Sequence, residues 1–418
     1  MGHAILSWLA GWCLGFGVKV FTTATDTSIV DAILQLIRRS LQAMTTSLCG
    51  AMLLLREMFT NDTSKESVNF ILDHLGDLLV FVYDLFKPAN VIPGAPTVDA
   101  DGSDMHSRIN NPYNELDLWQ KLNRFAIIYQ VQRVALTLLS ILQQGRQMPP
   151  SGLGGFQMDA RLPSDLGRDG RPPLETYISE LEGDVTSPSN EQWLFINGIA
   201  NELVWFQGSC DKIRDTFNRE VKGVYNRSDG ILWDLIECAG EHSAATDKQN
   251  ELITRTPSSR AAQEILRKEL TKALWPGERS IPDKVVMIAH SQGCLILRLV
   301  LQKLASENPI GSSKMLDMSD RLWVFTFGNP SIDWRVLGEE PQSLSGYAHV
   351  TEHFAHEADF VAMLGVVRHY KNAESGYGKG SVFLSKGGRG HLFGAHYPLG
   401  ADAYVNGSSS TLLLENHI

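Results

Sequence analysis

The chain has 418 residues, of which 43% are hydrophobic and 20% are charged, and its formal net charge is −10. This length exceeds one typical domain, and the composition is that of a folded protein with ample material for a buried core. The negative charge and the lack of a Lys/Arg cluster argue against a nucleic-acid partner, because phosphate contacts need clustered basic residues. Five cysteines without a Cys-x-x-Cys pair indicate reduced thiols, so we expect a cytoplasmic protein.

Residues 1–150 are predicted to form a mostly helical N-terminal region. An apolar run from Ala4 to Val18 is short for a membrane span, which needs about 20 residues, and it has no basic segment before it as a signal peptide would. We favour a helix packed on the body of the protein, then peripheral membrane contact, then a signal peptide. Apolar residues recur at helical spacing within 29–41, 68–79 and 116–142.

The middle of the chain predicts a domain boundary. Residues 147–173 are rich in Pro, Gly and Asp, a composition typical of a linker. We therefore divide the chain into the helical region 1–150, a linker 151–185 and a second domain 186–418.

The second domain alternates apolar strands with helices. The predicted strands are 193–196, 221–225, 284–289, 322–327, 349–354 and 381–384. The predicted helices are 203–217, 231–238, 258–273 and 295–305. This alternation predicts an α/β fold with a mainly parallel sheet of about six strands, covered by helices on both faces. Ligands of such sheets bind beyond the carboxyl ends of the strands.

One stretch after a predicted strand has the pattern of a nucleophile elbow. Residues 285–294 read Val-Val-Met-Ile-Ala-His-Ser-Gln-Gly-Cys, so a buried strand delivers Ser291 into a turn that opens a helix. The positions two before and two after an elbow serine must be small for strand and helix to pack closely, and Ala289 and Gly293 satisfy this requirement. The alternative is an ordinary buried strand whose turn carries a serine.

A catalytic serine needs a base and an orienting carboxylate. In this kind of elbow protein the chain order is serine, acid, histidine, each on a loop after a strand. Asp359 follows the predicted strand 349–354 and is flanked by apolar residues, so it is the favoured acid. Glu357 is the competitor.

Two histidines compete for the role of base. His391 follows a glycine-rich turn, and His396 lies five residues later. We favour His391 and keep His396 as the alternative; the unused one would hydrogen-bond its own loop. His290 and His356 are predicted to be structural and to point away from the site.

An oxyanion hole needs two N–H groups aimed at the developing negative charge. Gln292, directly after the serine, would supply one from the start of a helix. The second would come from Gly198 or Ile199 in the loop after the predicted strand 193–196. The alternative is a plain strand-to-helix turn that uses its glycine for geometry alone.

At these residues the chain resembles the α/β-hydrolase superfamily, and within it the class 3 lipases and uncharacterised fungal lipase-like hydrolases. The likeness covers roughly residues 190–400. It rests on five short motifs: His290-Ser291-Gln292-Gly293; Phe325-Thr326-Phe327-Gly328-Asn329-Pro330; Asp359-Phe360-Val361 with Leu364; Gly223-Val224-Tyr225-Asn226 with Ser228-Asp229-Gly230; and Gly390-His391-Leu392 with His396-Tyr397. The chain departs from the family in Ala289, where a glycine is usual, and in its doubled histidine.

The resemblance and the motif order together predict a serine hydrolase that cleaves carboxylic esters in lipid metabolism through an acyl-enzyme. Its partner would be a small-molecule ester or lipid, and the chemistry needs no metal or organic cofactor. The first alternative is an acyltransferase or thioesterase that uses the same triad. The second is a catalytically silent hydrolase fold that serves as an interaction module.

Overall fold

The computed structural model describes residues 111–117, 120–145, 175–181, 190–230, 257–277, 280–336, 342–378, 380–385 and 390–415, with the single residues 162, 165, 234, 238 and 388. The apolar run 4–18 and the helices predicted within 29–41 and 68–79 lie outside this part of the chain. None of the described helices is both long enough and apolar enough to cross a bilayer.

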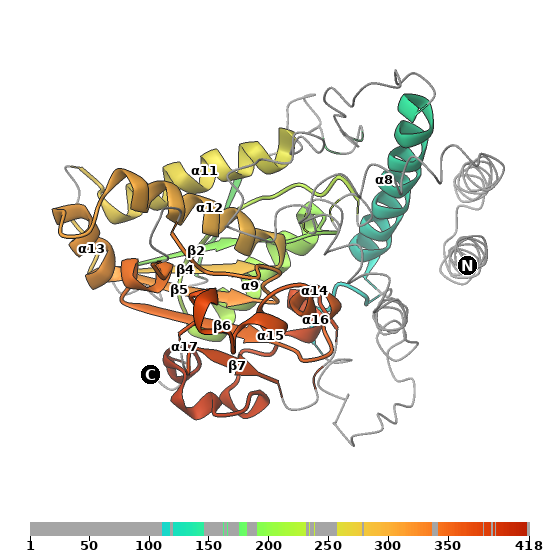
Figure 1. Ribbon diagram of the computed structural model, residues 1–418. Coiled ribbons are helices and arrows are strands. Elements are labelled where there is room, and N and C mark those ends of the chain that lie inside the picture. Colours follow the sequence, from blue (N-terminus) through green and yellow to red (C-terminus); the bar gives the residue numbers. More distant parts are fainter. Residues whose placement is uncertain are drawn as a thin grey trace.

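The described residues contain a seven-stranded, mostly parallel sheet (Figure 1). Its strands are β1 (Thr176–Ser179), β2 (Glu191–Ile196), β3 (Val221–Val224), β4 (Lys284–His290), β5 (Leu322–Phe327), β6 (Val350–Ala355) and β7 (Val382–Leu384). The order is β1-β3-β2-β4-β5-β6-β7, with β1 antiparallel to β3 and every other pair parallel. The six predicted strands and the mainly parallel α/β sheet are confirmed.

The seventh strand, β1, corrects the predicted domain boundary. It lies inside the predicted linker 151–185, so the sheet begins before the expected start at residue 186. β1 is an edge strand with a single buried residue, Ser179, and Ile178 on it is 46% exposed. A strand that buries so little lacks the apolar run by which strands are predicted from sequence.

Helices cover both faces of the sheet. Their bounds are α8 (Lys121–Gly145), α9 (Leu203–Phe217), α11 (Pro257–Leu274), α12 (Gln292–Glu307), α13 (Ser313–Arg321), α14 (Phe360–Met363), α15 (Val366–His369), α16 (Phe393–His396) and α17 (Thr411–Leu414), with short 3₁₀ turns η2 (Leu344–Tyr347), η3 (Ala373–Ser375), η4 (Ala401–Ala403) and η5 (Gly407–Ser409). The helices predicted at 203–217, 258–273 and 295–305 are confirmed as α9, α11 and α12. Of the helix predicted at 231–238, only residues 234 and 238 are described.

The two cores follow from the period-2 alternation of the strands. On β2, Leu194 and Ile196 enter the core beneath α11 and α12, whereas Trp193 and Phe195 enter the core beneath α9 and α17. Each fully buried side chain of this size contributes about 1.5–3 kcal/mol. The sheet therefore lies between two apolar layers.

Three of the five cysteines lie in the described part of the chain. Cys210, Cys238 and Cys294 are unoxidised thiols and all are buried. Cys294 Sγ lies 3.4 Å from the carbonyl oxygen of Ala289, against the sheet. These thiols therefore serve in packing.

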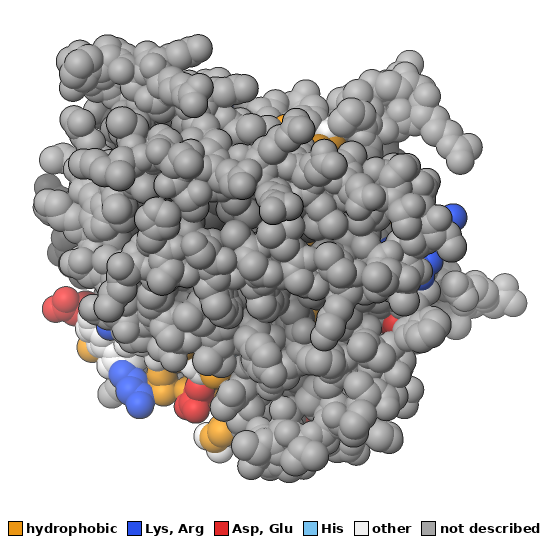
Figure 2. All heavy atoms as spheres, turned by 90° about the vertical axis from the view of Figure 1, so that its right-hand side faces the viewer, with side chains coloured by type: hydrophobic (Ala, Val, Ile, Leu, Met, Phe, Trp, Pro, Cys, Tyr) orange, Lys and Arg blue, Asp and Glu red, His pale blue; other side chains and the backbone are white. Residues whose placement is uncertain are grey.

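On the face shown in Figure 2, hydrophobic, basic and acidic side chains of described residues lie together in a small group at the lower left. Charges of both signs are mixed in this group. The described residues of this face thus form no large patch of one charge.

Candidate active site

The turn between β4 and α12 has the strained geometry of a nucleophile elbow. Ser291 lies between the two elements with φ 56° and ψ −128°, a conformation that a residue with a side chain rarely adopts. Its N–H donates to the carbonyl oxygen of Phe327 at 2.9 Å, which ties the turn to the end of β5. The elbow therefore projects its serine beyond the carboxyl end of the central strand.

His391 and Asp359 complete a hydrogen-bonded chain with this serine. His391 Nε2 lies 2.7 Å from Ser291 Oγ, and His391 Nδ1 lies 2.8 Å from Asp359 Oδ2. Because a carboxylate only accepts, Nδ1 carries the proton and Nε2 is left to accept from the serine hydroxyl. The three residues follow β4, β6 and β7, and all three side chains are buried.

The competing candidates lie outside this chain of hydrogen bonds. His396 Nδ1 accepts from the N–H of Leu392 at 3.0 Å, so this ring braces its own turn. Glu357 is exposed, whereas Asp359 is fully buried at the start of α14. The structure thus brings Ser291, Asp359 and His391 together and leaves His396 and Glu357 aside.

His290 contacts the loop that carries His391, contrary to the prediction that it points away. Its Nε2 lies 2.7 Å from the carbonyl oxygen of His391, and because a carbonyl only accepts, this nitrogen carries the proton. Burial, followed by the nearby His391, lowers the pKa of His290 well below its usual value. A neutral His290 therefore holds the backbone of His391. His356 is structural, as predicted: its Nε2 meets the carbonyl oxygen of His396 at 2.8 Å.

Tyr397 is a site residue that sequence reasoning missed. Its hydroxyl donates to Asp359 Oδ2 at 2.5 Å, the same oxygen that receives His391 Nδ1–H. The other oxygen of Asp359 accepts from the N–H of Val361 at 2.9 Å. The only sequence signal was the position of Tyr397 at the end of the histidine motif. Three donors thus fix the orientation of this carboxylate.

The loop after β2 approaches the serine very closely. A Cβ built on Gly198 would lie 2.1 Å from Ser291 Cβ and 2.7 Å from its Oγ, so only glycine fits there. Gln292 occupies the first position of α12, where backbone N–H groups have no partner within the helix. The backbones of Gly198 and Gln292 therefore both adjoin Ser291.

A buried hydrogen-bond network joins this loop to the elbow. Asn226 donates from Nδ2 to Gln292 Oε1 at 2.8 Å, and its backbone N–H donates to Asn197 Oδ1 at 2.8 Å. Asn197 in turn donates to the carbonyl oxygen of Asn226 at 2.7 Å. The ends of β2 and β3 are therefore held in register with the first residue of α12.

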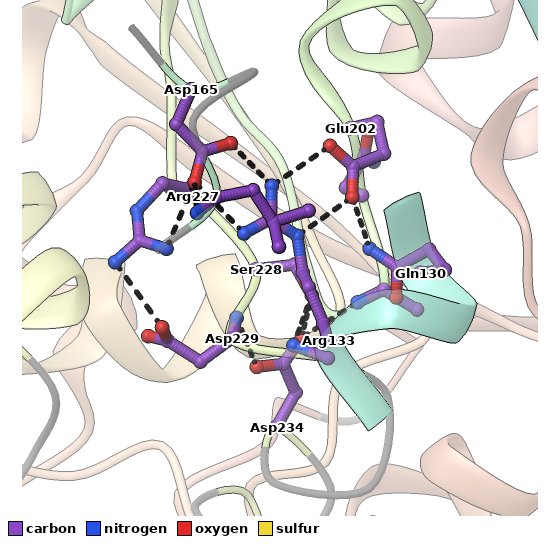
Figure 3. Close-up of polar contacts among 12 residues, drawn as sticks. Gln130, Arg133, Asp165, Glu202, Arg227, Ser228, Asp229 and Asp234 are labelled. Atoms are coloured by element: carbon purple, nitrogen blue, oxygen red, sulfur yellow. Dashed lines mark hydrogen bonds and ion pairs between the residues drawn. The ribbon is translucent and has the colours of Figure 1, made fainter. Parts of the chain in front are cut away.

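A second polar network holds the other end of the loop (Figure 3). Asp234 accepts from the N–H of Ala200 at 2.8 Å, and Ala200 has a positive φ of 51°. Arg133 of α8 is fully buried and points between two carboxylates, donating to Glu202 at 2.8 Å and to Asp165 at 2.9 Å. Residues from the predicted N-terminal region and linker therefore brace the loop that approaches Ser291.

An apolar cluster adjoins the triad. Ile199, Leu295, Phe360, Val361 and Leu364 are buried together, and Leu392 packs against them. These residues come from the loop after β2, from α12 and from the segments that follow Asp359 and His391. Ser291, Asp359 and His391 therefore lie next to an apolar cluster.

Searches against models of known protein families and against curated proteins find no match to this chain. The chemistry of the site is therefore inferred from its residues and geometry.

Proposed function

We propose that this protein is a serine hydrolase that cleaves carboxylic esters. One observation carries the proposal: Ser291, in a strained strand-to-helix turn, is joined to His391 at 2.7 Å, and His391 to Asp359 at 2.8 Å. A buried ordinary serine needs neither a positive φ nor a buried imidazole–carboxylate partner. Storing backbone strain at this residue is typical of a catalytic site.

In this mechanism Ser291 attacks the acyl carbon while His391 Nε2 takes the hydroxyl proton. The negative charge on the acyl oxygen is held by the N–H of Gln292 and by that of Gly198 or Ile199. His391 then gives the proton to the leaving alcohol, which departs as the acyl-enzyme forms. Water attacks the acyl-enzyme by the same steps in reverse and releases the acid and the free serine.

The arrangement supports assignment to the α/β-hydrolase superfamily, with class 3 lipases as the group that it resembles. The serine follows a central strand and opens a helix, and the second oxyanion donor comes from the loop after another strand. The acid and then the histidine follow later strands in chain order. These features are those expected of that superfamily.

The apolar cluster beside the triad favours a hydrophobic acyl group, as in a lipid ester. Its buried side chains include Ile199, Leu295, Phe360, Val361 and Leu364, which belong to the loop after β2 and to the segments that follow Ser291 and Asp359. Ser291 itself is fully buried beside this cluster. A lipase-like enzyme would therefore be more active on long-chain esters presented at an interface.

Labelling of the full chain with a fluorophosphonate tests the proposal. Wild type should label, Ser291→Ala should not, and Ser306→Ala on the exposed side of the same helix should label like wild type. Equal labelling of wild type and Ser291→Ala, or none of either, would leave an interaction module as the explanation. A panel of short and long acyl esters, thioesters and added acceptor alcohols then separates esterase, lipase, thioesterase and acyltransferase activity.

A further inference from the structure

The turn that carries His391 delivers two donors to one carboxylate oxygen. His391 stands at its start and Tyr397 at its end, and both donate to Asp359 Oδ2. Whether both side chains can reach this oxygen depends on the conformation of the turn 391–397. Whatever holds this turn therefore controls the geometry of the triad.

Two buried side chains of opposite charge hold the turn from outside it. Glu115 accepts from the N–H groups of Gly394 and Ala395, both at 2.7 Å. Lys212 of α9 donates to three carbonyl oxygens, those of Phe393 at 2.8 Å, Gly394 at 3.0 Å and Tyr397 at 2.6 Å. The carboxylate of Glu115 thus accepts from N–H groups of the turn, and the ammonium of Lys212 donates to its carbonyl oxygens.

The segment before α8 adds two further contacts. Asn111 Nδ2 donates to the carbonyl oxygen of Gly394 at 2.7 Å. A Cβ built on Gly394 would lie 2.0 Å from the carbonyl oxygen of Tyr113, so the two backbones touch. Residues 111–115 are thus seated on the turn although they lie about 280 residues away in the chain.

Burying two charges is unfavourable unless each is well hydrogen-bonded. Glu115 is 3% exposed and Lys212 is 7% exposed. Burial raises the pKa of Glu115, against which hydrogen bonds and the charge of Lys212 act. Burial lowers the pKa of Lys212 to about 8, and the charge of Glu115 acts in the opposite direction. An apolar pair could pack this turn, but it could not fix five backbone groups at once.

We infer that Glu115 and Lys212 are positioning residues that hold the turn 391–397 so that His391 and Tyr397 both reach Asp359. The N-terminal segment 111–117 is then a part of the catalytic machinery and not a separate attachment. This inference rests on the proposed hydrolase activity. A small movement of the turn is sufficient for a large effect, because a misplacement of about 1 Å can cost about 100-fold in rate.

Glu115→Gln in the full chain is the test. Glutamine keeps the shape and one acceptor oxygen, but it loses the charge and one of the two N–H partners. We expect kcat on a short-chain ester and the rate of fluorophosphonate labelling to fall by about 10- to 100-fold, with KM little changed. The low-field proton resonance of the His391–Asp359 hydrogen bond should shift or broaden.

Glu191→Gln is the matched control. This carboxylate, at the opposite end of β2, accepts from Arg219 and Trp193. Its loss should change stability without moving kcat or the proton resonance. A purely structural role for Glu115 would likewise leave both readouts unchanged.

The outcomes separate the two proposals. If wild type does not label at Ser291, the proposed function fails. If wild type labels and folded Glu115→Gln labels at the same rate, the positioning role is overturned. If Glu115→Gln does not fold, Asn111→Ala decides, since it removes one hydrogen bond to the turn: a smaller fall in kcat supports the inference, and a wild-type kcat overturns it.

Discussion

Gly198→Ala tests the most demanding contact in the site. The added Cβ would lie 2.1 Å from Ser291 Cβ and 2.8 Å from the carbonyl oxygen of His290. Carbon atoms in contact stay about 3.5–4.0 Å apart, so loop and elbow must separate by about 1.4 Å or more. The atoms that would move are backbone and the first side-chain carbon, which no rotamer change relieves.

The expected cost follows from that movement. A shift of about 1 Å costs about 100-fold in rate, and removal of one oxyanion donor costs about 100- to 1,000-fold. Both describe the same displacement, so they are not multiplied. We expect kcat for ester hydrolysis to fall by about 100- to 1,000-fold, or about 3–4 kcal/mol in transition-state stabilisation.

The assay is the rate of fluorophosphonate labelling together with steady-state ester hydrolysis, with folding checked by thermal unfolding. Gly208→Ala on α9 is the control, because a Cβ there meets nothing within 4 Å. It should leave activity unchanged and stabilise the helix by up to about 1 kcal/mol. A folded Gly198→Ala that labels as fast as wild type would refute the close approach and the role of this loop in the oxyanion hole.

Three further predictions concern the base, the buried arginine and pH. His391→Ala should lower ester hydrolysis by about 10⁴-fold or more, whereas His396→Ala, which removes one hydrogen bond within the turn, should lower it far less; the reverse order of losses would exchange their roles. Arg133→Met should destabilise the fold by about 3–5 kcal/mol in urea unfolding, because it leaves the buried carboxylate of Glu202 without its cation and leaves Asp165 with only the longer contact to Arg227. The exposed Arg267→Met should stay within about 0.5 kcal/mol, and equal losses would show that the buried pairs are unimportant. Burial lowers the pKa of His353 to about 3 in the folded protein, against about 6.5 in the unfolded chain. Below about pH 6.5 the unfolded state therefore binds one more proton than the folded state, and the free energy of unfolding decreases as the pH is lowered, by about 2 kcal/mol at pH 5. Urea unfolding between pH 7 and 5 checks this, and an equally steep loss in His353→Asn would contradict it.

The strands and the elbow could be predicted because their signals are local. Each parallel strand buried on both faces is a short apolar run, and six of the seven strands were found in this way. β1 was missed because an edge strand buries little. The candidates Ser291 and Asp359 follow from the same logic, since each stands directly after a predicted strand.

The choice between His391 and His396 was outside the reach of the sequence. Both lie in one glycine-containing motif, and their roles depend on how a seven-residue turn folds against distant elements. The contacts that shape this turn span 181 residues from Lys212 and 279 from Glu115. No local pattern carries such information.

The sequence by itself determined the α/β class, the order of strands and helices, and a short set of residues able to perform acyl transfer. Periodicity and turn chemistry are properties of neighbouring residues, so they can be read along the chain. The tertiary structure alone decided which histidine faces Ser291, that Tyr397 shares the carboxylate of Asp359, and that Asn111, Glu115 and Arg133 brace the loops that approach Ser291 and carry His391. These depend on hydrogen bonds and buried charges between segments far apart in sequence, which exist only after the chain has folded.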